Sequence, residues 1–193
     1  MKTALVIIDI QNDYFPDGKN ELVNSVEASL KAKDLLEHFR QRNLPVVHIR
    51  HLSVRPGSTY FIPGTKGAEI HANVQPLQNE KIIIKNYPNS FRETGLHDYL
   101  QEQQIEHLVI SGMMSHMCVD STARAGKDLG YRITIAEDAC ATKDLILQEQ
   151  KIPGPEIHRA FMAGLSYYYA EIKTSSQLIE QIKEFKNVLT TTE

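Results

Sequence analysis

The sequence predicts an α/β protein with three layers, in which helices cover both faces of a six-stranded parallel sheet. Short apolar runs alternate along the chain with longer segments whose apolar residues recur at helical spacing. Such alternation indicates parallel strands, because their connections must cross over the sheet and usually contain a helix. The chain has 193 residues, of which 41% are hydrophobic. It can therefore bury one core, and we predict a single domain over residues 1–193.

Six runs rich in Val, Ile and Leu predict the strands of this sheet. The first begins almost at the N-terminus, and a proline opens the second, a position that tolerates a residue without a backbone N–H. The runs are Thr3–Asp9, Pro45–Arg50, Lys81–Lys85, His107–Ser111, Tyr131–Ala136 and Ala170–Lys173.

Helical spacing of apolar residues fills most of the segments between these runs. In the first such segment, Leu35 and Phe39 lie one helical turn apart. The predicted helices are Ser25–Gln41, Gly95–Gln103, Cys118–Leu129, Pro155–Tyr168 and Ser176–Phe185. The stretch from Gly57 to Asn79 is rich in Gly and Pro and predicts a long loop.

Composition excludes several classes of protein. The 21 basic and 24 acidic side chains give a net charge of -3 and form no long block of one sign, so we expect no nucleic-acid or membrane partner. No apolar run approaches the roughly 18 residues of a membrane span, and no signal-peptide cleavage pattern is present. We therefore expect a cytoplasmic protein that acts on a small molecule. The two cysteines, Cys118 and Cys140, form no disulfide framework, and Cys140 is expected to pack in the core.

Three predicted strands are each followed by a side chain that can take part in chemistry. Asp9 ends the first strand, Lys85 ends the third, and Cys118 begins the helix after the fourth. Ligands of open α/β sheets bind at the C-terminal ends of the strands, so these side chains should meet there. Each one alone has an ordinary structural explanation, but their agreement favours a site. A thiol at a helix N-terminus is expected to have its pKa lowered from about 8.5 toward neutrality.

The same residues form motifs that resemble those of the isochorismatase-like cysteine hydrolases. The resemblance extends from Thr3 to Thr174 and rests on Asp9, Gln11 and Asp13 in a D-x-Q-x-D segment, on Lys85 ahead of Asn89-Ser90-Phe91, and on Gly112-Met113-Met114 ahead of Cys118. That family includes nicotinamidases, N-carbamoylsarcosine amidases, ureidoacrylate amidases and isochorismatases. The resemblance implies the strand order 3-2-1-4-5-6, in which the first and fourth strands are neighbours.

The resemblance also implies a catalytic triad. Cys118 would attack a carbonyl carbon, and Asp9 would accept the thiol proton and return it to the leaving amine. Lys85 would supply a fixed positive charge. The backbone N–H groups of Met114 and Cys118 would form an oxyanion hole, and the Met113–Met114 peptide bond would be cis. We expect cleavage of a C–N bond in a small amide, carbamoyl or lactam-like compound through a thioester-type intermediate.

The residues do not favour a metal or any other cofactor. Nicotinamidase-type relatives bind a divalent ion through an Asp-x-His segment, and His51 and Ser53 occupy those two positions here. The missing pair disfavours nicotinamidase activity, which stays an alternative. A site formed by His48, His51 and His71 is a weaker alternative. Isochorismatase-type hydrolysis of a vinyl ether is also a weaker alternative, because enzymes of that type typically lack the cysteine.

Loop residues near the expected crevice are the candidates for binding the substrate. They are Gln11, Phe15, Tyr60, Phe61, Glu69 and Phe91.

Two explanations without catalysis remain open. Cys118 could be a redox-sensing thiol with Cys140 as its resolving partner, or the chain could form a catalytically silent oligomer. Whichever explanation holds, catalytic or not, we expect a homodimer or homotetramer, because the family resemblance implies dimers or tetramers and the segment Pro153–Tyr169 offers an apolar stripe. The stripe consists of Ile157, Phe161, Leu165 and Tyr168.

Overall fold

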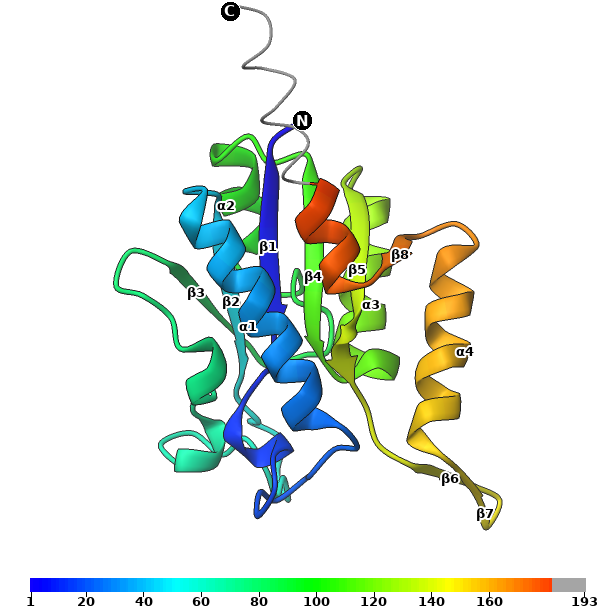
Figure 1. The fold of residues 1–193 in the computed structure, drawn as a ribbon. Coiled ribbons are helices and arrows are strands. Elements are labelled where there is room, and N and C mark those ends of the chain that lie inside the picture. The colour runs from blue at the N-terminus through cyan, green and yellow to red at the C-terminus, as the bar shows by residue number, and fades with distance from the viewer. Residues whose placement is uncertain (182–193) are drawn as a thin grey trace, which may run out of the picture.

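The computed structural model describes residues 1–181, which form a six-stranded parallel sheet between two layers of helices (Figure 1). The strands of the sheet are β1 (Thr3–Ile8), β2 (Val46–His51), β3 (Lys81–Lys85), β4 (His107–Met113), β5 (Arg132–Ala141) and β8 (Glu171–Lys173). Their order is β3-β2-β1-β4-β5-β8, and each neighbouring pair is parallel. Since β8 is the sixth strand of this sheet along the chain, the predicted fold class and strand order are confirmed.

Alternate residues of β1 build the cores on the two sides of the sheet. Leu5 and Ile7 belong to one buried cluster, whereas Val6 and Ile8 belong to the other. Successive side chains of a strand point to opposite faces, so a continuous apolar run serves both layers. This explains why a central strand reads as uniformly apolar.

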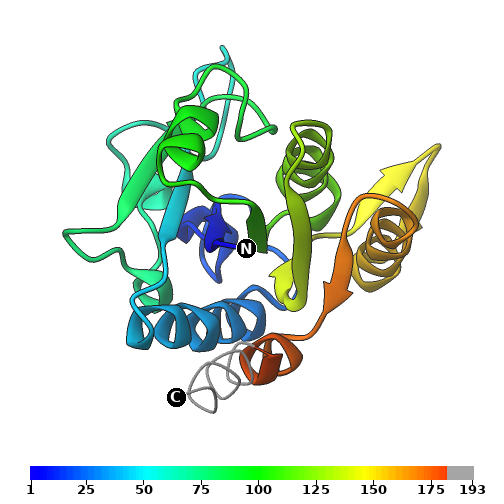
Figure 2. The ribbon, with the colours of Figure 1, turned by 90° about the horizontal axis from the view of Figure 1, so that it is seen from above.

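Helices cover both faces of the sheet (Figure 2). One layer contains α1 (Ser25–Gln41) and a helix at residues 175–181, whose Leu178 packs into the cluster of Leu5. The other layer contains α2 (Leu96–Glu102), α3 (Asp120–Asp128) and α4 (Gly154–Ser166). The helix predicted at Ser176–Phe185 therefore begins one residue earlier, and its positions 182–185 lie outside the described residues.

The boundaries of β4 and β5 differ from the prediction. β4 continues through Met113 and β5 through Ala141, because the strands pair beyond a register shift that follows Ile110. In this extension Gly112 lies opposite Cys140, and Met113 lies opposite Ala141. The additional length of each strand depends on a partner distant in sequence, which local periodicity does not register.

A small hairpin after β5 has no counterpart in the prediction. β6 (Leu145–Leu147) pairs antiparallel with β7 (Gln150–Ile152) and projects from the body of the molecule beside α4 (Figure 1). Gln148 and Glu149 form its turn with positive φ angles of 47° and 64°. Such a turn is usually marked by Asn or Gly, and neither is present to indicate it.

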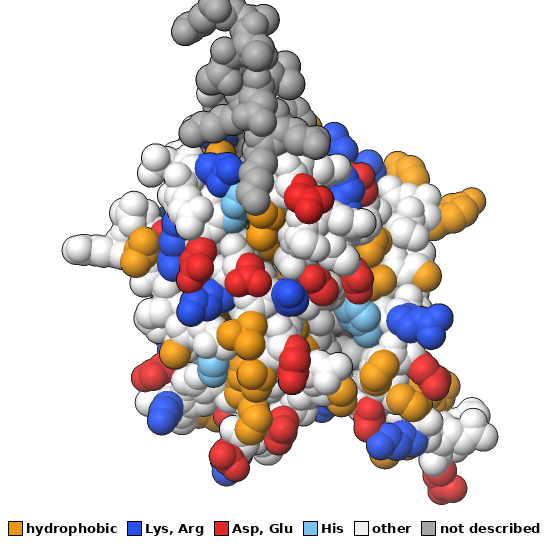
Figure 3. Space-filling view, viewed as in Figure 1, with side chains coloured by type: hydrophobic (Ala, Val, Ile, Leu, Met, Phe, Trp, Pro, Cys, Tyr) orange, Lys and Arg blue, Asp and Glu red, His pale blue; other side chains and the backbone are white. Residues whose placement is uncertain are grey.

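The predicted long loop contains two short 3-10 turns, η2 (Lys66–Ala68) and η3 (Ala72–Val74), and a third, η1 (Asn12–Tyr14), follows β1. On the face formed by α1, acidic and basic side chains are interspersed (Figure 3). None of the helices within residues 1–181 combines the length and apolar character needed to cross a bilayer.

Candidate active site

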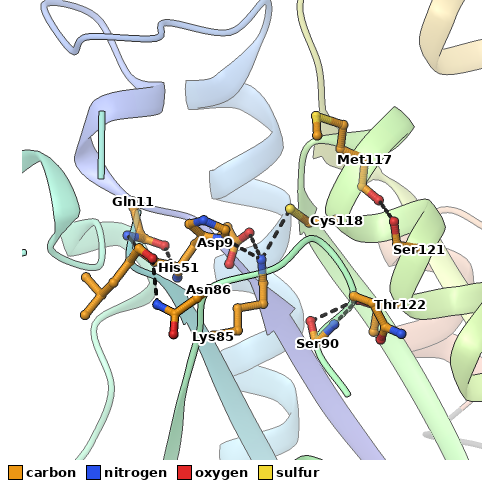
Figure 4. A network of polar contacts seen from close by, with 12 residues as sticks. Asp9, Gln11, His51, Lys85, Asn86, Ser90, Met117, Cys118, Ser121 and Thr122 are labelled. Atoms are coloured by element: carbon orange, nitrogen blue, oxygen red, sulfur yellow. Dashed lines mark hydrogen bonds and ion pairs between the residues drawn. The ribbon is translucent and has the colours of Figure 1, made fainter. Parts of the chain in front are cut away.

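The side chains of Asp9, Lys85 and Cys118 meet at the C-terminal edge of the sheet (Figure 4). The Nζ atom of Lys85 lies 2.7 Å from Oδ2 of Asp9 and 3.3 Å from Sγ of Cys118. β1 and β4 are neighbours in the sheet, so the residues that follow them are brought together. The predicted meeting of the three side chains is confirmed, while their catalytic roles stay predictions.

The group is almost completely removed from solvent. Asp9 and Lys85 are 0% exposed and Cys118 is 5% exposed. Burial by itself lowers the pKa of Lys85, but the neighbouring Asp9 and Cys118 raise that pKa above its ordinary value. Lys85 therefore stays an ammonium ion, and its charge is compensated by the carboxylate it contacts.

The thiol of Cys118 does not have the lowered pKa that the sequence suggested. Burial raises the pKa of Cys118 well above its usual range, and the Asp9 carboxylate raises it further, against the lowering effect of Lys85. The expectation was wrong because desolvation, together with the nearby carboxylate of Asp9, disfavours the thiolate more than the ammonium of Lys85 stabilises it. In the site without substrate, Cys118 is a neutral thiol that requires a base.

A carboxylate oxygen of Asp9 is available as that base. An oxygen of Asp9 and the sulfur of Cys118 lie within 4.8 Å of each other. The Oδ1 atom of Asp9 is buried, and the described residues offer it no hydrogen-bond partner. The carboxylate thus has one oxygen bonded to Lys85 and a second with capacity to accept a proton.

The turn that carries Cys118 combines a close strand contact with an irregular helix start. Gly112 has a φ of 132°, and a Cβ atom there would overlap the carbonyl oxygen of Ile8. The Met113–Met114 peptide bond is cis. A single π-helical turn, η4 (Ser115–Val119), then precedes α3. The oxyanion hole inferred for the N–H groups of Met114 and Cys118 stays a prediction.

Gln11 supports the site from within the protein. Its Nε2 atom donates to the carbonyl oxygens of His51 and Ala68, both at 2.9 Å, and its Oε1 atom accepts from the N–H of His51 at 2.7 Å. Both N–H groups of the amide donate to backbone carbonyls, its oxygen already accepts one backbone N–H, and the side chain is 0% exposed. We therefore correct the expected role of Gln11 from binding substrate to joining β2 to the loop at η2.

Two of the predicted aromatic residues lie beside the site. Cys118 and Asp9 both raise the pKa of Tyr60, after the larger effect of burial. The ring of Phe61 lies 5.9 Å from the ring of His51, measured between centroids. Tyr14, which the sequence did not indicate, packs on Phe61 with centroids 4.6 Å apart.

The other predicted binding residues lie elsewhere or face solvent. Phe15 is 4% exposed and stacks on His71, with ring centroids 3.6 Å apart. Phe91 is partly buried, stacks on Tyr131 and packs against the core cluster that contains Tyr131, so its position does not support a binding role. The side chain of Glu69 is exposed, and the carbonyl oxygen of Glu69 accepts from the backbone N–H of Asn12. These differences arise because sequence places a residue on a loop but does not orient its side chain.

Asp13, the second acid of the D-x-Q-x-D segment, positions the aromatic loop. Its Oδ2 atom accepts from the N–H of Phe61 at 2.6 Å, and its Oδ1 atom accepts from the N–H of Lys19 at 3.3 Å. The segment therefore places a candidate base at Asp9 and two structural contacts at Gln11 and Asp13.

The residues present do not fit a divalent metal. Within residues 1–181, a set of three possible ligands is formed by Asp9, His51 and Cys118, but the ammonium of Lys85 already contacts each of them. The three-histidine alternative is not supported either. His48 contacts Glu80 at 2.9 Å, and Nδ1 of His71 accepts from the N–H of Asn73.

Comparison with known proteins identifies the family. The model of the isochorismatase domain matches residues 3–177. The chain belongs to the isochorismatase family. The isochorismatase family protein YddQ of Bacillus subtilis is 46% identical over 180 residues, which cover 93% of this chain and all of YddQ.

Solved structures of the isochorismatase family share this fold. A candidate isochorismatase hydrolase from Oleispira antarctica is 43% identical, covers 93% of this chain and 96% of its own, and superposes with a TM-score of 0.89. N-carbamoylsarcosine amidase from Thermoplasma acidophilum is 25% identical, covers 91% of this chain and 97% of its own, and has a TM-score of 0.77. This isochorismatase-family protein is therefore a hydrolase.

Proposed function

We propose that this protein cleaves a C–N bond of a small amide, carbamoyl or related compound, with Cys118 as nucleophile, Asp9 as proton carrier and Lys85 as fixed cation. The observation that carries the proposal is the placement of one buried ammonium against both a carboxylate and a thiol. An acyl transfer through sulfur requires a base that takes the thiol proton and a positive charge that stabilises the resulting thiolate.

In the first half of the reaction, Asp9 takes the proton of Cys118 as the sulfur attacks the carbonyl carbon of the substrate. The carbonyl oxygen gains the negative charge and is stabilised by the N–H groups of Met114 and Cys118. When the tetrahedral adduct collapses, the C–N bond breaks, Asp9 delivers its proton to the leaving nitrogen, and the acyl group remains on sulfur as a thioester.

In the second half, water attacks the thioester carbon and Asp9 accepts a proton from that water. The C–S bond breaks, the acid product leaves, and the proton returns to the sulfur of Cys118. Lys85 keeps its proton throughout, consistent with its raised pKa. Its charge favours the thiolate at both stages, which offsets part of the desolvation cost.

Two observations favour an amide over the alternatives. The cysteine is retained and lies beside its proposed base, whereas hydrolysis of a vinyl ether does not need a nucleophilic sulfur. The similarity to N-carbamoylsarcosine amidase also supports C–N chemistry. Tyr60 and Phe61 are the side chains that we propose to contact the substrate, because they lie on the loop beside Cys118 and His51.

A redox-sensing role fits the thiols less well. Burial raises the pKa of Cys140 to about 12 and also raises the pKa of Cys118. Sensor thiols are accessible and have a lowered pKa, whereas Cys118 and Cys140 are both buried.

A substrate panel tests the proposed reaction. We expect purified protein to release ammonia or an amine from at least one member of a panel containing primary amides, N-carbamoyl amino acids, ureido compounds and small lactams. Amine release is measured by a coupled assay, and the acid product is measured by mass spectrometry. The panel includes isochorismate, for which we expect no turnover. Pyruvate release from isochorismate without amine release from any amide would contradict the proposal.

The proposed setting of this reaction is a cytoplasmic homodimer or homotetramer. The predicted α4 stripe is only partly available, because Ile157 and Leu165 are buried. Tyr168 of the stripe is 66% exposed. The larger exposed apolar side chains near the stripe are Tyr167, Ile146 and Leu147, exposed by 94%, 76% and 64%.

Sedimentation velocity at micromolar concentration tests this assembly. We expect a species of at least twice the 21.9 kDa of one chain, because the exposed apolar side chains near α4 favour association. Tyr167→Ser together with Ile146→Ser should shift the population toward monomer. A wild-type monomer at that concentration would contradict the assembly.

A further inference from the structure

The ammonium of Lys85 has as many acceptors as it has protons. Among the described residues, Oδ2 of Asp9 at 2.7 Å, Nδ1 of His51 at 2.9 Å and Sγ of Cys118 at 3.3 Å lie within bonding distance of its Nζ atom. A lysine ammonium donates three hydrogen bonds and accepts none. Since Lys85 is 0% exposed, water does not replace a missing acceptor, and each partner matters.

The ring of His51 is held in place for this contact. His51 is the last residue of β2, and its backbone N–H and carbonyl are both hydrogen-bonded to the side-chain amide of Gln11. The ring of Phe61 packs beside it at 5.9 Å between centroids. The imidazole is therefore fixed from the backbone and from one side, so that Nδ1 faces Lys85.

The contact requires a neutral imidazole with its proton on Nε2. Burial lowers the pKa of His51 to about 4, with a further lowering effect from Lys85. Asp9 acts in the opposite direction and Arg55 acts in the same direction as Lys85. At neutral pH the lone pair on Nδ1 is thus free to accept a hydrogen bond from the ammonium.

We infer that His51 is a positioning residue that accepts a hydrogen bond from the third N–H of Lys85 and so holds the ammonium against both Asp9 and Cys118. The role of this contact in catalysis rests on the proposed function. It also explains why Asp9, His51 and Cys118 resemble a set of metal ligands: the lysine ammonium occupies the position among them that a metal ion would need.

Loss of this acceptor has a defined consequence. The ammonium would either keep one N–H without an acceptor in a buried site, which is unfavourable, or turn away from the sulfur. In both cases the positive charge stabilises the thiolate less effectively, so the thiol becomes harder to ionise. Reactivity of Cys118 therefore reports on His51 without any substrate.

The test compares two substitutions of nearly equal size. In His51→Asn the Oδ1 atom can occupy the place of Nδ1 and accept from Lys85, whereas His51→Leu removes the acceptor. Both are made in a Cys140→Ala background, so that Cys118 is the only thiol. The alkylation rate with iodoacetamide is measured as a function of pH.

We expect His51→Asn to alkylate within about threefold of the background protein, and His51→Leu to alkylate about tenfold or more slowly at neutral pH, with its profile moved to higher pH. Equal rates and profiles for the two variants, both folded by circular dichroism, would overturn the inference. Because no substrate is used, this result is independent of whether the protein hydrolyses amides.

A second measurement does not depend on any His51 variant being folded. Co²⁺ bound by a thiolate gives a charge-transfer absorption, and it accepts mixed sulfur, nitrogen and oxygen ligands. We expect no such band when Co²⁺ is added to the wild-type protein. A wild-type band that saturates at one metal per chain would show that the ammonium does not occupy the space between Asp9, His51 and Cys118. That result would overturn the inference.

Discussion

Replacing Cys118 by Ala is expected to reduce turnover by about 10³-fold or more, because no other group in the site can form the acyl intermediate. The fold should survive, since the change removes one sulfur atom from a short side chain. Initial rates of amine release measure the activity, and thermal unfolding measures the stability. Acid quenching of the wild-type reaction followed by mass spectrometry should reveal the acyl adduct on the peptide that contains Cys118.

The matched control is the same substitution at the other buried cysteine. Cys140 lies on β5 opposite Gly112, and it has no contact with Asp9 or Lys85 in the proposed mechanism. Cys140→Ala should therefore keep most of the activity. Covalent catalysis through Cys118 would be refuted if Cys118→Ala kept more than about a tenth of wild-type turnover, since loss of an activated nucleophile costs far more.

Replacing Lys85 by Met is expected to remove turnover and also to destabilise the protein. Met has a side chain of similar length but no charge, so the substitution leaves the carboxylate of Asp9 buried without its cation. Breaking one side of a buried ion pair typically costs about 3–5 kcal/mol. Equilibrium unfolding in urea should therefore show a lower free energy of unfolding for Lys85→Met at neutral pH.

The double variant Asp9→Asn with Lys85→Met separates the two effects. Removing the carboxylate charge should recover much of the lost stability, because no uncompensated ion is left in the interior. Turnover should stay absent, since both the proton carrier and the cation are missing. A Lys85→Met protein with wild-type unfolding behaviour would show that the ion pair does not contribute as its burial indicates.

Local sequence is a good guide to elements whose character is set by their own residues. The helix Ser25–Gln41 and the strand Lys81–Lys85 have the predicted boundaries. In α1 the positions that pack on the sheet recur with helical spacing. By contrast, β4 and β5 extend because they pair with each other beyond a register shift, and the β6–β7 hairpin forms without the usual turn residues. The extension of β4 and β5 depends on partners that are distant along the chain, whereas the hairpin is a local pairing whose turn lacks the residues that usually indicate one.

The site divides in the same way. The approach of Asp9, Lys85 and Cys118 was predictable, because each lies at or after the C-terminal end of a strand and the strand order implied by the resemblance brings those ends together. The hydrogen bond between His51 and Lys85 was not predictable, although the position of His51 at the end of β2 indicates that it lies near the site. Its importance depends on the direction of one ring nitrogen toward Lys85. Gln11 and Phe91 were assigned to substrate from their positions, whereas packing gives them structural contacts.

The sequence by itself determined the layers and the three side chains at the edge of the sheet, because apolar periodicity and the C-terminal ends of parallel strands suffice for these. The strand order was implied by the resemblance to a known family. Only the tertiary structure decided the state of those side chains. Burial makes Cys118 a neutral thiol despite its position near a helix start, and it makes Lys85 depend on three acceptors drawn from three segments. Desolvation arises from everything packed around a group, so it becomes known only when the whole fold is in place.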